Sequence, residues 1–538
     1  MSTDANPTTP DGLLDHDEVV EAIVLSSEEA PTGPLPAGVF RRLIGGLAVF
    51  ASTILASYFV PGLEFAQPWK AGEDYVPYWN LIGRELMGQG ARAAAADEAQ
   101  ARFEAMARDG GEASGGPDRA PDRSGEAFAG DGWPAYAPPE GGDPTPVARI
   151  EHPEHLDAFF DALGRTDIGL AKRVTRVGHW GDSVLGNDGI TYELRQRMQL
   201  RFGDAGHGFH SLVKYDPSYK HQRIEFSEKG KWGSCYIIRK CRDEGRYGYG
   251  GTTAWAAGGP SSAFGTSDKG PVGQKISSFE LWYMTQPNGG DFVIDVDGKE
   301  AARVSTAAAD IADAWSKIEL DDGPHQVRVR SGGGGRTRGY GVVLEREGPG
   351  VVWDGMALIG AFTGRLLLQD PEHWRTQLAH RDLDLVVFTF GGNDMGDGAL
   401  KKLDAYEAKY AELIQRTRAA DPDLACLVMA PLDHGERKGN RIVSRPIVAP
   451  MVEAQRRVAE ANGCAFFDTF TAMGGEGSMG RWYRATPKLG NGDLAHPTRA
   501  GHRVIGEMLF AALMADYARW REAHAGESLG SVDPGDAP

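Results

Sequence analysis

A chain of 538 residues exceeds one ordinary domain, so its length predicts two or three folded units joined by linkers. Its 75 acidic residues outnumber the 57 basic ones and give a formal net charge of -18. This balance excludes a nucleic-acid partner, because phosphate neutralisation needs clustered lysine and arginine. The four cysteines are too few for a disulfide scaffold, and no Cys/Cys or Cys/His pair has the spacing of a zinc site, so no metal site is expected from them.

The N-terminal part predicts a membrane anchor. Residues 1–42 are acidic and rich in polar residues, and we expect a disordered cytoplasmic tail there. Residues 43–63 carry no charge, and as a helix they would span about 31 Å, the thickness of a hydrocarbon core. Arg41 and Arg42 precede this stretch, which places the rest of the chain outside the cytoplasm. A buried core helix and a late signal peptide are the alternatives.

Two further segments are predicted to lie outside the folded domains. Residues 64–146 combine an alanine-rich, helix-prone piece with a flexible linker that is dense in Gly, Pro, Asp and Ser. Residues 524–538 are predicted to form a disordered tail. The linker would let a folded unit stand away from the membrane.

The segments 147–205 and 348–523 alternate predicted strands and helices. Such alternation indicates an α/β domain with a parallel sheet and right-handed crossovers. Parallel sheets place their chemistry at the carboxyl ends of the strands. The predicted strands are 173–177, 383–390, 424–430 and 465–468, and the predicted helices are 155–163, 191–202, 403–419, 448–461 and 501–517.

Residues 206–347 change to a strand pattern and predict an inserted all-β sandwich or jelly roll. Phe292, Ile294 and Val296 alternate with other residues ahead of an Asp297-Gly298 turn, which is typical of a hairpin. The aromatic residues of the insertion either stack on sugar rings or fill the sandwich core, and both interpretations stay open. They are Tyr247, Tyr249, Trp255, Trp282, Tyr283 and Trp315.

The cysteines allow different interpretations. Cys235 and Cys241 lie six positions apart in a β-rich stretch, so they can form a disulfide in an oxidising compartment. Cys426 and Cys464 lie in apolar, strand-like runs, where buried free thiols are an equally good interpretation.

Three short motifs place reactive side chains at the expected edge of the sheet. Ser183 follows a strand and a glycine turn, which exposes its hydroxyl, and Asn393 follows two glycines at another strand end. Asp493 lies three residues before His496, so its carboxylate can accept a hydrogen bond from the imidazole. Each motif alone also fits a helix cap, a turn or a surface loop. Their combination indicates Ser183 as nucleophile, His496 as base and Asp493 as the group that orients it.

These motifs resemble the four blocks of the SGNH (GDSL) hydrolase superfamily over about residues 147–520. The matching residues are Gly181-Asp182-Ser183, Gly391-Gly392-Asn393-Asp394 and Asp493 to His496, with Gly360 as the second block. The resemblance implies a flavodoxin-like three-layer sandwich without a cofactor. It also implies an oxyanion hole made by the amides of Ser183 and Gly360 and the side chain of Asn393.

An SGNH core split by a β-sandwich is similar to the envelope peptidoglycan O-acetylesterases, whose insertion resembles a carbohydrate-binding module. Residues 472–482 add to this similarity. The resemblance implies a serine esterase that deacetylates a cell-envelope glycan, above all peptidoglycan. The predicted anchor at residues 43–63, which such enzymes need not have, indicates a single-pass protein of the bacterial inner membrane with its catalytic part in the periplasm or envelope. The alternatives are a polysaccharide O-acetyltransferase or lipid esterase on the same site, and a non-catalytic glycan-binding protein.

The remaining polar residues near these motifs are predicted to have supporting roles. His179, His434 and His502 are interpreted as structural, although His179 could line the cleft. Asp394 is predicted to support the turn that carries Asn393.

Overall fold

The computed structural model describes residues 52, 56, 98–108 and 128–529. The predicted tail at 1–42, the predicted anchor at 43–63 except Ser52 and Ala56, and residues 530–538 of the tail predicted at 524–538 lie outside the described residues. Residues 524–529 of that tail are described, and the backbone N–H of Gly526 donates to the carbonyl of Trp133 at 2.9 Å. Searching only the described part of the chain for a long apolar helix able to cross a membrane finds none. The chain divides into two units, Met1–Ala95 and Ala96–Pro538, and the sheets and helices below belong to the second.

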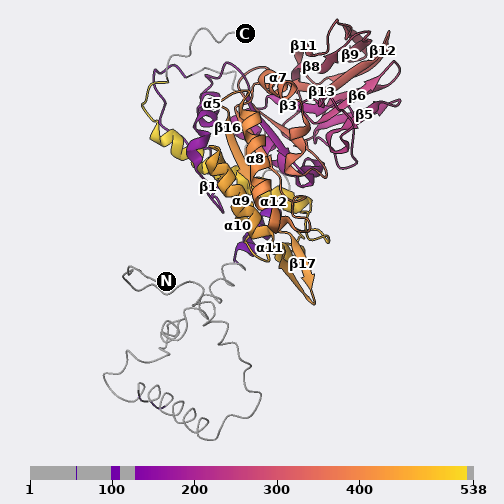
Figure 1. Ribbon diagram of the computed structural model, residues 1–538. Helices are drawn as coiled ribbons and strands as arrows, with labels where there is room; N and C mark the ends of the chain where they lie inside the picture. Colours follow the sequence, from indigo (N-terminus) through magenta and orange to yellow (C-terminus); the bar gives the residue numbers. More distant parts are fainter. Residues whose placement is uncertain (1–51, 53–55, 57–97, 109–127, 530–538) are drawn as a thin grey trace, which may run out of the picture. The chain divides into compact units, whose positions relative to one another are not determined.

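A mixed six-stranded sheet with the order β1-β19-β16-β15-β2-β14 forms the centre of the α/β part (Figure 1). Five of its strands run parallel, and β1 pairs antiparallel at one edge. The buried central strands are nearly continuous apolar runs, as expected when helices cover both faces. The strands are β1 (Ile150–Glu151), β2 (Thr175–Gly181), β14 (Val351–Ala357), β15 (Leu385–Thr389), β16 (Ala425–Met429) and β19 (Ala465–Phe467).

Alternate side chains of the sheet enter two separate cores, which defines three layers. In β15, Leu385 and Val387 enter the core formed with α5, α6 and α12, whereas Val386 and Phe388 enter the core formed with α7, α8 and α9. The predicted three-layer α/β sandwich is therefore confirmed. The helices are α5 (Asp157–Asp167), α6 (Gly189–Phe202), α7 (Pro371–Arg381), α8 (Leu403–Arg418), α9 (Val448–Ala461), α10 (Thr469–Ala472), α11 (Ser478–Arg484) and α12 (Arg499–Ala523).

Between α6 and β14 the chain forms antiparallel sheets. One has the order β10-β9-β12-β7-β4, and the other has the order β11-β8-β13-β6-β5 with β3 paired to β13. Apolar residues between them, such as Phe264, Phe279 and Ile294, are fully buried. The strands are β3 (Gly206–Ser211), β4 (Ile224–Lys229), β5 (Gly233–Tyr236), β6 (Thr252–Ala256), β7 (Ser261–Thr266), β8 (Ile276–Thr285), β9 (Asp291–Val296), β10 (Lys299–Ser305), β11 (Ala312–Gly323), β12 (Gln326–Gly333) and β13 (Thr337–Glu345).

Aromatic residues join the β part to the α/β part. The ring of Trp180 in β2 lies 4.9 Å from that of Tyr249, and its indole N–H donates to the Tyr249 carbonyl at 3.2 Å. Trp282 is also buried, and Trp315 stacks on His380 of α7 at 3.9 Å. These contacts favour the interpretation of the aromatic residues as packing residues. The core on the α7, α8 and α9 face of the sheet therefore contains residues of both parts.

The structure contains two disulfides. Cys235 pairs with Cys241, as the sequence allows. Cys426 pairs with Cys464, so the interpretation of these two as free thiols is wrong. Cys426 lies in β16 and Cys464 directly precedes the neighbouring strand β19, and their Cα atoms are 4.6 Å apart. The 38 residues between them conceal this proximity in the sequence.

Candidate active site

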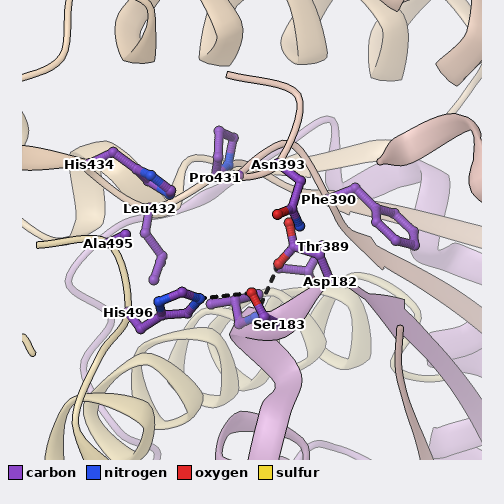
Figure 2. A pocket seen from close by; sticks show the side chains of 12 residues that line it. Asp182, Ser183, Thr389, Phe390, Asn393, Pro431, Leu432, His434, Ala495 and His496 are labelled. Carbon is purple, nitrogen blue, oxygen red and sulfur yellow. Dashed lines mark hydrogen bonds between the residues drawn. The ribbon is translucent and has the colours of Figure 1, made fainter. Parts of the chain in front are cut away.

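One cavity of about 220 Å³ lies at the carboxyl ends of the central strands. Ser183 follows β2, Asn393 follows β15, and His434 follows β16. The loop that precedes α12 brings His496 to the same place (Figure 2). Parallel strands thus collect side chains from distant segments of the chain. The cavity is lined by Asp182, Ser183, Val184, Thr389, Phe390, Gly392, Asn393, Pro431, Leu432, His434, Ala495 and His496.

Ser183, His496 and Asp493 form a continuous hydrogen-bonded chain. The Oγ atom of Ser183 lies 2.7 Å from Nε2 of His496, and Nδ1 of His496 lies 2.9 Å from Oδ2 of Asp493. The other carboxylate oxygen of Asp493 accepts the backbone N–H groups of Ala495 and His496, both at 3.0 Å. Partial burial acts against ionisation, but these hydrogen bonds outweigh it and lower the pKa of Asp493. The arrangement can transfer a proton from the hydroxyl to the imidazole.

A tight turn presents the nucleophile. Gly181 ends β2, and a Cβ atom there would lie 2.7 Å from the carbonyl oxygen of Thr389, so no larger residue fits without a shift. The Asp182 carboxylate then accepts the backbone N–H of Val184 at 3.0 Å and caps the turn that carries Ser183, the first residue of η3 (Ser183–Asp188). Burial raises the pKa of Asp182 to about 6. This buried carboxylate is a structural element of the nucleophile turn.

The predicted oxyanion residues occupy different positions. Asn393 lines the cavity, and its Nδ2 donates to the carbonyl of Ala361 at 3.0 Å. An amide nitrogen carries two hydrogens, so this bond orients the side chain and leaves the second N–H for a ligand. Gly360 lies in an exposed turn after β14 with φ +80°, and it is not among the residues that line the cavity. The structure therefore places Ser183 and Asn393 at the cavity and Gly360 beside it.

The sequence did not single out His434 as a cavity residue. Its ring lines the cavity and lies across from Ser183 (Figure 2). Burial, together with the positive charges of Arg445 and His496, lowers the pKa of His434 to about 4, so the ring is neutral at neutral pH. His434 lies shortly after the end of β16, and this position alone would have predicted that it lies at the carboxyl edge of the sheet.

The other predicted supporting residues lie outside the reacting group. His179 is buried, its Nε2 lies 2.7 Å from Oγ1 of Thr389, and burial lowers its pKa to about 3. Asp394 accepts the backbone N–H and the hydroxyl of Thr363, both at 2.9 Å, and so holds the loop that carries Asn393. His502 is buried beside Gly189.

One group of side chains in the described part of the chain has the spacing to hold a metal ion. His152, Glu154 and His155 have ligand atoms within 4.8 Å of one another, in and next to η2 (Pro153–Leu156). None of the three lines the cavity.

The other short 3-10 helices are η4 (Ile237–Arg239), η5 (Thr363–Leu368) and η6 (Ala399–Lys402).

Comparison with known proteins finds one matching family model and solved structures that are similar to parts of this chain. The model of the GDSL-like lipase/acylhydrolase family matches residues 319–504, which include Asn393, Asp493 and His496. No curated protein matches the chain. A solved peptidoglycan O-acetylesterase is similar in fold, with 19% identity and a TM-score of 0.55 over 70% of this chain and 98% of that chain. A family two carbohydrate esterase from Clostridium thermocellum has 13% identity and a TM-score of 0.24 over 53% of this chain and 98% of that one.

Proposed function

Because the chain carries a GDSL-like acylhydrolase domain and is an esterase of the SGNH type, we propose that it removes O-acetyl groups from peptidoglycan. The observation that carries this proposal is the hydrogen-bonded chain from Ser183 through His496 to Asp493, with Asn393 in the same cavity. The cavity is small and has apolar walls at Phe390 and Leu432, which suits a short acyl group.

The reaction follows from this geometry. His496 takes the hydroxyl proton while Oγ of Ser183 forms a bond to the acetyl carbonyl carbon. The negative oxygen of the tetrahedral intermediate accepts the backbone N–H of Ser183 and the side-chain N–H of Asn393. The sugar oxygen leaves with the proton from His496, and acetyl-serine remains. Water then gives a proton to His496 and attacks the acetyl carbonyl carbon, and the bond from that carbon to Oγ of Ser183 breaks. His496 returns the proton to Oγ, and the product leaves as acetic acid, which ionises to acetate.

The fold and the disulfides support the choice of substrate and compartment. The peptidoglycan O-acetylesterase shares the fold over 70% of this chain, with a sequence identity of 19%. Disulfides persist in oxidising compartments, and this chain has two. The proposal therefore places the catalytic part in the periplasm or cell envelope, held there by the anchor predicted at residues 43–63.

Replacing the nucleophile tests the proposal. We expect Ser183→Ala to fold normally and to lose acetate release from both an aryl acetate and O-acetylated peptidoglycan by more than about 10³-fold. Ser234→Ala, in an exposed position on β5, is the matched control and should keep full activity.

The products distinguish the competing functions. Acetate release by the wild-type protein from the aryl acetate but not from peptidoglycan would contradict the proposed substrate. Acetyl transfer to an acceptor glycan in place of acetate release would identify a transferase. Normal turnover by Ser183→Ala would end the assignment of the nucleophile.

A further inference from the structure

A basic hairpin stands at the edge of the catalytic cavity. Strand β17 (Gly435–Lys438) begins directly after His434 and pairs with β18 (Arg441–Ser444), and Figure 1 shows β17 projecting from the α/β part. Residues 435–445 contain four basic residues and one acidic residue, in a chain whose net charge is -18. The charge of this hairpin is therefore opposite to that of the protein as a whole.

Hydrogen bonds fix the base of the hairpin to the catalytic loops. The backbone N–H of Gly435 donates to the carbonyl of Leu494, between Asp493 and His496, at 2.7 Å. The backbone N–H of Arg445 donates to the carbonyl of His434 at 2.8 Å, and its guanidinium donates to the carbonyl of Met395 at 2.6 Å. Since Met395 follows the loop of Asn393, the hairpin is tied to both sides of the cavity. Its position relative to the triad is set by the fold.

Cations from the hairpin and from a neighbouring loop gather around one tyrosine. The guanidinium carbon of Arg437 lies 5.6 Å from the ring centre of Tyr483, and Nζ of Lys488 lies 4.6 Å from it. A Cβ atom on Gly492, the residue before Asp493, would lie 3.9 Å from the same ring. The Tyr483 cluster, defined as Arg437, Tyr483 and Lys488, is thus adjacent to the triad loop.

The cations of this surface are available to a ligand. Arg437, Arg441 and Lys488 are exposed, and within the described part of the chain none of them forms an ion pair. Lys438 differs, because its Nζ lies 2.9 Å from the carboxylate of Glu436. Exposed cations grouped beside a cleft attract an anionic substrate and raise its local concentration.

We propose that the β17–β18 hairpin and the Tyr483 cluster bind carboxylate groups of the substrate, and thereby select an anionic glycan over a neutral one. This proposal rests on the proposed function, because the peptides of peptidoglycan carry carboxylates. The guanidinium groups would pair with carboxylates of the bound strand, while the acetyl ester enters the cavity beside His434.

Charge reversal tests the binding directly, without turnover. In a Ser183→Ala background, we would combine R437E, R441E and K488E and measure cosedimentation with insoluble O-acetylated peptidoglycan at increasing NaCl concentrations. We expect the unreversed protein to bind with an affinity that falls with salt, and the reversed variant to bind about tenfold or more weakly with little salt dependence. The matched control reverses Lys172, Lys229 and Lys231, three exposed lysines that belong to neither the cavity nor the hairpin, and should bind normally.

A second arm changes the ligand. Amidation of the peptidoglycan carboxylates should weaken binding of the unreversed protein to the level of the reversed variant. Equal binding by the reversed and unreversed proteins, or unchanged binding after amidation, would overturn the proposal. These outcomes are independent of the enzymatic assay. Carboxylate-dependent binding by Ser183→Ala, combined with no acetate release by the wild-type protein, would contradict the proposed function and leave the binding surface intact.

Discussion

The carboxylate of Asp493 contacts both the imidazole ring and the backbone N–H of His496. One oxygen lies 2.9 Å from Nδ1, and the other accepts the backbone N–H at 3.0 Å. Asp493→Asn can keep the backbone contact, but its amide N–H would face Nδ1 and favour the wrong imidazole tautomer. We expect kcat on an aryl acetate to fall by about 10³-fold or more, with an unchanged unfolding midpoint. Asp268→Asn, in an exposed position, is the control, and a loss below tenfold in Asp493→Asn would contradict this role.

The buried carboxylate of Asp182 should make stability depend on pH. Burial raises its pKa from 3.8 to about 6, so the folded state prefers the neutral form. The neutral Asp182 therefore stabilises the fold fully at pH values below 3.8, and this contribution is lost as the pH rises through about 6. Asp182→Asn cannot titrate, and between pH 4 and pH 7 its free energy of unfolding should gain about 2 kcal/mol relative to the wild type. Denaturant unfolding across this pH range measures the difference, and a difference independent of pH would refute the prediction.

The two disulfides should contribute unequally to stability. Cys426 and Cys464 close a segment of 38 residues, whereas Cys235 and Cys241 close one of six. The loop-entropy relation gives losses of about 4 and about 2 kcal/mol when the respective pairs are replaced by alanine. Chemical denaturation of the two double variants compares them. A larger loss at the shorter loop would show that chain entropy is not the main contribution.

A buried arginine of α7, Arg381, connects a strand of the α/β part to a strand of the β part. Arg381 donates to Asp354 of β14 at 2.7 Å and to Glu345 of β13 at 2.6 Å. Both carboxylates are buried, so Arg381→Met leaves them incompletely paired and should cost about 3–5 kcal/mol of stability. The control is Arg375→Met on the same helix, whose exposed pair with Glu372 is screened by solvent and should leave the stability nearly unchanged. Similar unfolding temperatures for the two variants would contradict the prediction.

The sequence predicts the α/β layers well because the signals for these elements are local. The helix predicted at 448–461 coincides with α9, and the helix predicted at 403–419 differs from α8 by one residue. The triad motifs were also found, because each lies at the end of an element that the sequence predicts. Ser183, Asp493 and His496 meet as expected.

Features that depend on contacts between distant segments were missed. No local pattern connects Cys426 to Cys464, because their proximity arises from the order of strands in the sheet. The hairpin after His434 has strands of only four residues, too short for a clear alternation. Gly360 was assigned from its spacing, and spacing does not fix where a turn lies relative to a cavity.

The order of strands in the central sheet also constrains biogenesis. Strand β2, which leads to the nucleophile, has β14 and β15 as its neighbours, and both are synthesised only after the entire β part. While the chain emerges from the ribosome, the β2 segment has no pairing partner for more than one hundred further residues, at about 5–20 residues per second. During that interval Trp180 lacks Trp374 and Phe388, two of its aromatic neighbours in the folded protein, so the esterase becomes competent only late in its own synthesis.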